Sequence, residues 1–454
     1  MRCVKPLLFL VLVSGLLLSA RAASTNSIVW QTATDRVTAD VRGEALWPLL
    51  EDIAHQTGWH IFVEPGVDRK ADVKFKDLPR GEALKKLLGD LNFAYVPKTN
   101  EADHLYVFAT TMRAATQRVV EQALAKAAAH PKYVANELLV KVKPGTDIDA
   151  LAKSLGAKVV GRDDKLGLYR LKFDDAAATE TALGKLKDNP DVATVDYNYL
   201  YDPPVGPQRI ANAPVGPVSL ALNPPGDNGR VIVGLVDTAI QPLGGDLDQF
   251  ILKPVSVAGD ASVNSSDPTH ATSMAETILR AMAAQGGATS AQILPVDVYG
   301  SDTMASTWNV ALGIQQAVNA GANPINLSLG SSSDSAILNQ VIQDAQAQGI
   351  VFFAAAGNQP VSTPTYPAAL AGVYAVGATQ GNQLASYSNY GSFIAIALPG
   401  ASVVYLGGMS YVVQGTSPAT AYASGIAAGA KSSSTMTWAQ ILNSMQQKFP
   451  VPGK

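Results

Sequence analysis

The sequence predicts a doubly wound α/β domain with a parallel sheet after residue 230, preceded by two small α+β domains of βαββαβ type. Three observations support this prediction. Unbroken apolar segments alternate with helical segments after residue 230, a strand-helix-strand pattern occurs twice between residues 36 and 109, and a further α+β pattern fills residues 133–202. With 454 residues, the chain is long enough for several domains that each bury a core.

The composition is that of a well-packed globular protein. Apolar residues make up 47% of the chain and charged residues 16%, and no basic stripe occurs anywhere. This excludes a largely disordered chain, and we expect no nucleic-acid partner.

Residues 1–23 have the composition of an export signal. Two basic residues precede an apolar run from Leu7 to Leu18, and small residues suited to cleavage follow near Ala22. The run is shorter than the roughly 20 apolar residues that a membrane-spanning helix needs, so we expect a cleaved signal. The sole cysteine, Cys3, lies inside this signal, so the exported chain would have no disulfide and no thiol nucleophile.

Residues 24–112 are predicted to form the first small domain. The segments TADVRGEALWPLLEDIAHQTGWHIFV and VKFKDLPRGEALKKLLGDLNFAYV repeat one pattern, with RGEAL at 42–46 and again at 80–84. In each copy a strand leads into a helix with apolar residues at helical spacing. The pattern resembles the short N-terminal domain of secretins and TonB-dependent receptors, which implies docking of a partner in the Gram-negative envelope. The alternative is a generic βαββαβ domain without a partner.

Residues 113–130 are rich in Ala and lack Gly and Pro, which predicts a helical linker. The next segment, 131–203, has the order strand, helix, strand, strand, helix, strand. Its segments VKVKPG, LAKSLGAKVV, GLYRLKF and NPDVATVDYN resemble the inhibitory propeptide of the subtilases. The resemblance implies that this domain is an intramolecular inhibitor. Residues 204–229 are rich in Pro and are predicted to be a linker.

The large domain is predicted over residues 230–454. The segment RVIVGLVDTAI indicates a buried parallel strand with Asp237 at its carboxyl end. Similar apolar segments recur at AQILPVDV, NPINLSLG, GIVFFAAAGN and GVYAVGAT, and helical segments such as ASTWNVALGIQQAVNAG separate them. This alternation predicts a parallel sheet covered by helices on both faces.

Three polar residues of this domain are candidates for catalysis, namely Asp237, His270 and Ser417. Each also has an ordinary structural explanation, as a turn cap, a solvated loop residue or a helix N-cap. Together they are the set that activates a hydroxyl, because an imidazole removes its proton and a carboxylate orients the imidazole. Their order, with about 33 residues from Asp to His and about 147 from His to Ser, is that of subtilisin.

The motifs around these residues resemble those of the subtilase family of serine peptidases. They are VGLVDTAI, HATSMAETI, NPINLSLGS, VFFAAAGN, TYPAALAGVYAVGAT, LASYSNYGS and QGTSPATA, and they span some 215 residues. The resemblance implies a subtilisin-like fold in which Asp237 orients the base, His270 is the general base and then acid, and Ser417 is the nucleophile.

The resemblance also implies an oxyanion site and a substrate-binding strand. Asn358 matches the residue whose side-chain amide donates to the oxyanion. Thr365 matches a position near the base of the first specificity pocket that is often Gly, so we expect a preference for smaller P1 side chains. The residues that match the strand pairing with substrate backbone are Ser328, Leu329 and Gly330.

The sequence departs from the family at three places. The family's HGTHVAG is HATSMAE here, which introduces Ala271, Ser273 and Glu276. The nucleophile is followed by Pro418, which is tolerated in the first turn of a helix. Asp246 matches a calcium ligand of the family, but the Asn-rich loop that supplies further ligands is replaced by AMAAQGGATSAQ. We therefore predict no metal and no cofactor.

These observations predict an exported serine endopeptidase, secreted or periplasmic, that is made as a self-processing zymogen and acts on proteins or peptides. The alternative is a catalytically inactive subtilase fold that binds envelope partners through its N-terminal module. An aspartic protease is a weaker alternative because VDTA has no second copy. A zinc hydrolase is weaker still, because the predicted large domain has one His and no Cys.

Overall fold

The computed structural model describes residues 27–32, 34–64, 67, 69–98, 102–115, 117–119, 132–210, 220, 222, 231–260, 263, 267–285 and 290–453. The predicted export signal lies outside these residues, as do residues 120–130 of the predicted helical linker and most of 211–229 of the Pro-rich linker. In the part of the chain that is described, no helix has the length and apolar character needed to cross a membrane.

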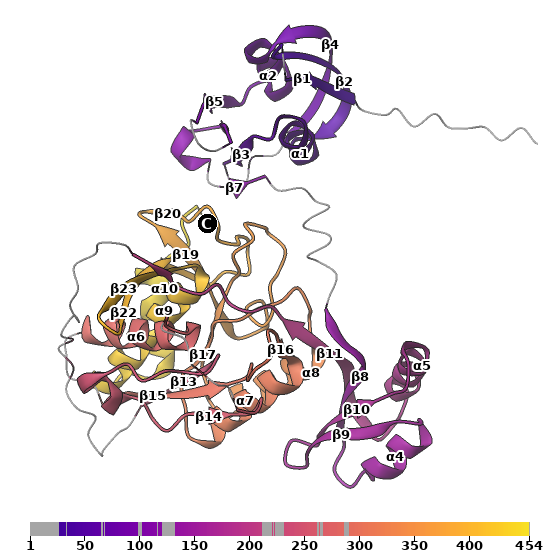
Figure 1. Ribbon diagram of the computed structural model, residues 1–454, viewed down its shortest axis with the longest axis vertical. Coiled ribbons are helices and arrows are strands. Elements are labelled where there is room, and N and C mark those ends of the chain that lie inside the picture. The colour runs from indigo at the N-terminus through magenta and orange to yellow at the C-terminus, as the bar shows by residue number, and fades with distance from the viewer. Residues whose placement is uncertain are drawn as a thin grey trace, which may run out of the picture.

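Residues 27–119 fold around an apolar core of their own (Figure 1). One antiparallel sheet has the order β1-β2-β4, formed by β1 (Ser27–Gln31), β2 (Arg36–Ala45) and β4 (Lys70–Pro79). A second sheet has the order β5-β6-β3-β7, formed by β5 (Asn92–Val96), β6 (His104–Phe108), β3 (His60–Val63) and β7 (Gln117–Arg118). The buried leucines of α1 (Leu46–Thr57) and α2 (Arg80–Leu88) pack into this core, as their helical spacing predicts.

The two RGEAL segments take different conformations. The first lies at the end of β2, and only its last residue begins α1, whereas the second lies entirely in α2. The prediction of a helical linker over residues 113–130 is wrong for its first residues. Met112–Ala114 forms a single 3-10 turn, and β7 pairs antiparallel with β3, because pairing with an open sheet edge outweighs local helix propensity.

Residues 132–201 contain the predicted order of strand, helix, strand, strand, helix, strand. The elements are β8 (Tyr133–Val142), α4 (Ile148–Ser154), β9 (Lys158–Asp163), β10 (Leu168–Lys172), α5 (Ala176–Lys187) and β11 (Val192–Tyr201). Asp147 and Asp175 cap the two helices, which pack on one face of the sheet. β11 extends beyond this sheet and pairs with β16 (Ala305–Ser306) of the large domain (Figure 1).

The large domain has an eight-stranded sheet with the order β14-β15-β13-β17-β18-β19-β20, in which β21 also pairs with β19. All pairs are parallel except that of β20. The strands are β13 (Ile232–Asp237), β14 (Val255–Ser256), β15 (Gln292–Asp297), β17 (Ile325–Leu327), β18 (Phe352–Ala355), β19 (Val373–Gln380), β20 (Gln383–Leu384) and β21 (Ile396–Pro399).

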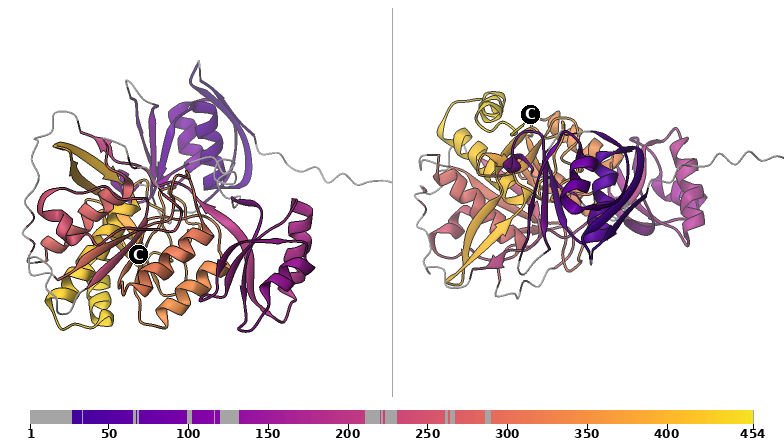
Figure 2. Two further views of the ribbon diagram at one scale, coloured as in Figure 1. Left: turned by 60° about the horizontal axis from the view of Figure 1, so that its bottom comes forward. Right: turned by 90° about the horizontal axis from the view of Figure 1, so that it is seen from above.

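Helices cover both faces of this sheet (Figure 2). One face carries α7 (Thr307–Asn319) and α8 (Ala336–Gln346), and the other carries α6 (His270–Ala283), α9 (Thr416–Ser433) and α10 (Trp438–Lys448). β13 is buried on both sides, since Val236 packs with α7 while Val233 and Leu235 pack with α6. The predicted doubly wound parallel sheet is confirmed.

The position of β13 prepares a site at its carboxyl end. The strand lies next to β15, and the helices that come after these two strands, α6 and α7, cover opposite faces of the sheet, which is where α/β proteins bind ligands. A smaller sheet packs beside α6, formed by β12 (Gln208–Arg209), β23 (Met409–Gln414) and β22 (Ala401–Leu406), and β23 leads directly into α9.

Candidate active site

Asp237 and His270 form a hydrogen-bonded pair at the carboxyl end of β13. Nδ1 of His270 lies 2.8 Å from Oδ1 and 2.9 Å from Oδ2 of Asp237. Both side chains are buried, with exposed fractions of 1% for Asp237 and 4% for His270. A carboxylate that accepts from Nδ1–H selects the tautomer in which Nε2 has a free lone pair, and Nε2 is then able to accept a proton.

The loop after β13 and the first turn of α6 are joined by hydrogen bonds that fix this pair. The N–H of Thr238 donates to Asp237 Oδ1 at 2.7 Å, and the Thr238 hydroxyl accepts from Ala271 N at 3.0 Å. Thr269 is the N-cap of α6, and its own N–H donates to Gln241 Oε1 at 2.7 Å. The Thr before His270 is a readable capping signal, whereas nothing in the sequence indicates the role of Gln241.

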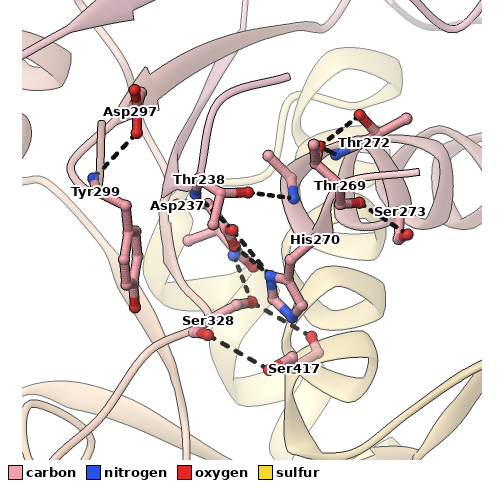
Figure 3. A network of polar contacts seen from close by, with 12 residues as sticks. Asp237, Thr238, Thr269, His270, Thr272, Ser273, Asp297, Tyr299, Ser328 and Ser417 are labelled. Atoms are coloured by element: carbon pink, nitrogen blue, oxygen red, sulfur yellow. Dashed lines mark hydrogen bonds and ion pairs between the residues drawn. The ribbon is translucent and has the colours of Figure 1, made fainter. Parts of the chain in front are cut away.

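Ser417 is the second residue of α9 and is 8% exposed. Figure 3 shows the His270 ring between the Asp237 carboxylate and the Ser417 side chain. The Ser417 hydroxyl donates to the carbonyl oxygen of Ser328 at 3.3 Å. A rotation about its Cβ–Oγ bond turns the hydroxyl proton from the Ser328 carbonyl toward His270.

Close packing of α6 and α9 sets the distance between the base and the nucleophile. A Cβ added to Gly425 of α9 would lie 2.4 Å from the carbonyl oxygen of Ile278 on α6. Only glycine allows the two backbones to approach this closely, and both catalytic candidates lie in the first turns of these two helices.

Asn358 lies against the N-terminus of α9. Its Oδ1 accepts from Thr416 N at 2.8 Å and from the Thr416 hydroxyl at 3.0 Å. A Cβ at Gly415, where φ is +143°, would lie 2.9 Å from Asn358 Nδ2, so glycine is needed there. Because Oδ1 is held by Thr416, the amide group faces the other way and is available to an oxyanion together with Ser417 N–H.

Ser328, Leu329 and Gly330 directly follow β17 but lie outside it, so the strand predicted here ends at Leu327, and Thr365 packs against this segment at Gly330. A Cβ added to Gly330 would lie 2.7 Å from the Thr365 methyl carbon, and one added to Gly357 would lie 3.0 Å from the Thr365 hydroxyl. Asn389 Nδ2 donates to that hydroxyl at 2.8 Å and fixes its orientation. Thr365 thus fills space between the segment at Gly330 and the segment at Gly357.

Glu276, one of the departures from the family, lies away from the catalytic pair and is 4% exposed. Its Oε2 accepts from Tyr405 N at 2.7 Å, and its Oε1 accepts from Arg280 Nη2 at 2.5 Å. The Arg280 guanidinium also lies over the Tyr405 ring. Burial raises the pKa of Glu276. The residue fastens α6 to the hairpin β22–β23 that leads to Ser417.

Two polar side chains of β11 cap helices of the large domain. Asp196 Oδ2 accepts from Ala336 N at 2.7 Å, at the start of α8, and Asn198 Oδ1 accepts from Trp308 N at 3.1 Å, at the start of α7. Lys141 forms an ion pair with Asp344 at 2.5 Å. Burial raises the pKa of Asp196 despite the hydrogen bonds that it accepts.

A cavity of about 210 Å³ lies beside Asn358, and part of its wall comes from the chain that follows β11. The residues that line it are Val205, Gly206, Gln208, Asn358, Tyr387, Val412, Gln414 and Gly415. Within the described ranges, no group of three or more His, Cys, Asp or Glu residues is placed to hold a metal ion. The expected absence of a cofactor stays a prediction.

Two family models match the chain. The model of the subtilase family matches residues 228–449, and that of the fervidolysin N-terminal prodomain matches residues 119–198. The second match begins inside the predicted helical linker and covers most of the predicted propeptide.

Curated relatives and a solved structure agree with these matches. Subtilisin BL of Lederbergia lenta is 36% identical over 199 residues, which cover 41% of this chain and 74% of that protein. The thermophilic serine proteinase of Bacillus sp. (strain AK1) is 31% identical over 322 residues, 65% of this chain and 78% of that protein. M-protease of Shouchella clausii is 36% identical, but the chain spans about half (52%) of its length.

Fervidolysin of Fervidobacterium pennivorans, described as a keratinolytic enzyme related to subtilisin, has a similar fold with a TM-score of 0.53. The match has 20% identity and covers 65% of this chain and 54% of that chain. At this identity the likeness supports the fold alone.

Proposed function

Because this chain belongs to the subtilase family of serine peptidases, with a subtilisin-like protease domain and an N-terminal prodomain, we propose that it is an exported serine endopeptidase made as a self-processing zymogen. One observation carries the proposal most directly. Asp237 holds the imidazole of His270 by Nδ1 at 2.8 Å, and the ring lies next to Ser417 (Figure 3).

The chemistry follows from this geometry. The Ser417 hydroxyl oxygen attacks the scissile carbonyl carbon while His270 Nε2 removes its proton, and the charge of Asp237 stabilises the imidazolium that results. Asn358 Nδ2 and Ser417 N–H donate to the oxyanion. His270 then protonates the leaving amine. A water molecule, activated by the same base, hydrolyses the acyl-enzyme and restores the Ser417 hydroxyl.

We propose that the substrate binds as an added strand along Ser328, Leu329 and Gly330. Thr365 limits the depth of the first pocket, because its methyl group packs on Gly330 and its hydroxyl is held by Asn389. Small P1 side chains are therefore preferred. One extra or missing methylene group in an apolar pocket changes the discrimination between two substrates by about 1–3 kcal/mol.

Residues 131–203 are proposed to form the inhibitory domain, and 24–112 a separate small domain before it. The helix caps made by Asp196 and Asn198 of β11 and the ion pair of Lys141 of β8 support inhibition in the same chain, since they attach this domain to the large domain. For residues 24–112 the core around α1 and α2 supports an independent module. We propose that this module docks a partner of the Gram-negative envelope, as in secretins and TonB-dependent receptors.

A second candidate is an inactive subtilase fold that binds partners. The hydrogen bond from the Ser417 hydroxyl to the Ser328 carbonyl favours it, because the nucleophile is then not directed at the base. The test is labelling of the purified full chain with a fluorophosphonate probe, with Ser417→Ala as the control. Labelling that requires Ser417 supports the peptidase. An unlabelled chain, with the Ser417→Ala variant equally able to bind partners, supports the second candidate.

A further inference from the structure

We propose that the zymogen cuts its own chain at the peptide bond between Val205 and Gly206. The inference rests on the proposed peptidase function and names the bond on which that function first acts. Residues 202–207 are called the strap below.

The strap is held at both ends against the large domain. Before it, Leu200 and Tyr201 pair antiparallel with Ser306 and Ala305 of β16. After it, Gln208 and Arg209 pair antiparallel with Val412 and Tyr411 of β23. β23 leads directly to Gly415 and Ser417. The chain that follows the strap is therefore paired with the strand that precedes the nucleophile.

The middle of the strap lies beside the oxyanion donor. Val205 and Gly206 both line the 210 Å³ cavity that Asn358 and Gly415 also line. The carbonyl between these two residues is therefore the strap carbonyl best placed to approach Asn358 Nδ2 and the start of α9.

The prolines of the strap exclude most other bonds. Three bonds place a proline nitrogen on the leaving side, namely those before Pro203, Pro204 and Pro207. That nitrogen carries a ring carbon where His270 would deliver its proton. Bonds that follow a proline are also unfavourable, because proline has no N–H to donate to the carbonyl of Ser328 at the start of the substrate-pairing strand.

Two peptide bonds between Tyr201 and Gln208 neither precede nor follow a proline, and only one of them is available for cleavage. The bond after Tyr201 belongs to the ladder with β16, and Tyr201 is fully buried in the core. The remaining bond joins Val205 to Gly206. Val205 is 62% exposed, so its side chain is free to turn into the first pocket, and its small size matches a pocket limited by Thr365.

The step balances as an ordinary hydrolysis. The Ser417 oxygen bonds to the Val205 carbonyl carbon, its proton passes to His270, and the carbon–nitrogen bond to Gly206 breaks as His270 protonates the Gly206 nitrogen. Water then releases the Val205 carboxylate and returns the proton to Ser417. No oxidant or further reactant takes part.

The test maps the new N-terminus of the processed full chain by N-terminal sequencing and intact mass. Gly206→Pro places a proline nitrogen on the leaving side, and Gly206→Ala is the matched control, because a Cβ at this position meets no atom within 4 Å. We expect the wild-type protein to begin at Gly206 after processing. We expect Gly206→Ala to be cut at the same bond and Gly206→Pro to lose this cut. Because the chain cuts itself, the first-order rate constant of wild-type processing should be independent of protein concentration.

Fluorophosphonate labelling of Ser417 separates the possible failures. A mature N-terminus at any other residue in a chain that labels overturns this assignment and leaves the peptidase intact. A chain that neither labels nor processes overturns both. Retained cleavage at this bond in Gly206→Pro also overturns the assignment.

Discussion

The carboxylate of Asp196, on the last strand of the proposed inhibitory domain, accepts a hydrogen bond from the backbone N–H of Ala336 at the start of α8, at 2.7 Å. This contact joins two segments 140 residues apart and is partly buried. It is one of several contacts that attach the inhibitory domain, together with the Asn198 cap and the pairing of β11 with β16.

Replacing Asp196 by Ala removes the carboxylate that accepts the hydrogen bond from Ala336 N–H. We expect Asp196→Ala, in a Ser417→Ala background, to lower the free energy of unfolding by about 1 kcal/mol, in the range of a lost N-cap. Urea unfolding measures the change, with Asp191→Ala as a control on an exposed carboxylate just before β11. Equal stabilities for the two variants would contradict this role.

Charge at Asp196 is expected to weaken the same attachment. Burial raises the pKa of this carboxyl above the ordinary 3.8, so the folded state binds the proton more tightly than the unfolded state. The stabilising contribution is complete below pH 3.8 and is lost as the pH rises through the higher folded pKa. Asp196→Asn keeps an acceptor without the charge, so its unfolding free energy should fall less over this pH interval than that of the parent. An identical pH profile would count against the claim.

Glu276 is expected to matter for stability more than for chemistry. Its replacement by Ala leaves Tyr405 N–H and the Arg280 guanidinium without their shared partner. Loss of one member of a fully buried pair costs about 3–5 kcal/mol, which is the upper bound for this partly buried pair. Thermal unfolding of Glu276→Ala, compared with Asp302→Ala as an exposed control, measures the effect. A change as small as that of the control would mean that Glu276 does not fasten α6 to the hairpin.

Thr365→Gly is expected to widen the first specificity pocket. The substitution removes the Thr365 methyl group that packs on Gly330. It should raise kcat/KM for substrates with Phe or Tyr at P1 by roughly 10-fold or more relative to substrates with Ala or Val at P1. A peptide library with varied P1 residues measures this, and Thr363→Gly, two residues earlier and exposed, is the control. Efficient cleavage after Phe or Tyr by the unsubstituted enzyme would refute the preference for small side chains.

Asn358→Ala is expected to lower kcat by about 100- to 1,000-fold with little change in KM, as for the loss of an oxyanion donor. Asn358→Asp keeps an acceptor for Thr416 N but has no amide to donate, so it separates the two roles of this side chain. Steady-state kinetics on a peptide substrate make the comparison. If Asn358→Asp retained full kcat, the contact with Thr416 would be the only role of Asn358.

Much of the large domain is readable from sequence because its strands are apolar on both faces and its helices have clear periodicity. Asp237 at a strand end and His270 at a helix start follow from those local patterns. Other features depend on contacts that no local pattern encodes. β7 forms in place of a predicted helix because an open sheet edge is present, and β12 forms in a Pro-rich segment because β23 is beside it. Tyr405, one of the two partners of Glu276, lies on a hairpin 129 residues away.

Labelling of the full chain with a fluorophosphonate probe, followed by identification of the modified residue by mass spectrometry, tests the central claim most directly. The account predicts modification of Ser417, its loss in Ser417→Ala, and strongly reduced labelling in His270→Ala, because the hydroxyl then has no base. A chain that stays unlabelled, or that labels equally in Ser417→Ala, would contradict a catalytic set made of Asp237, His270 and Ser417.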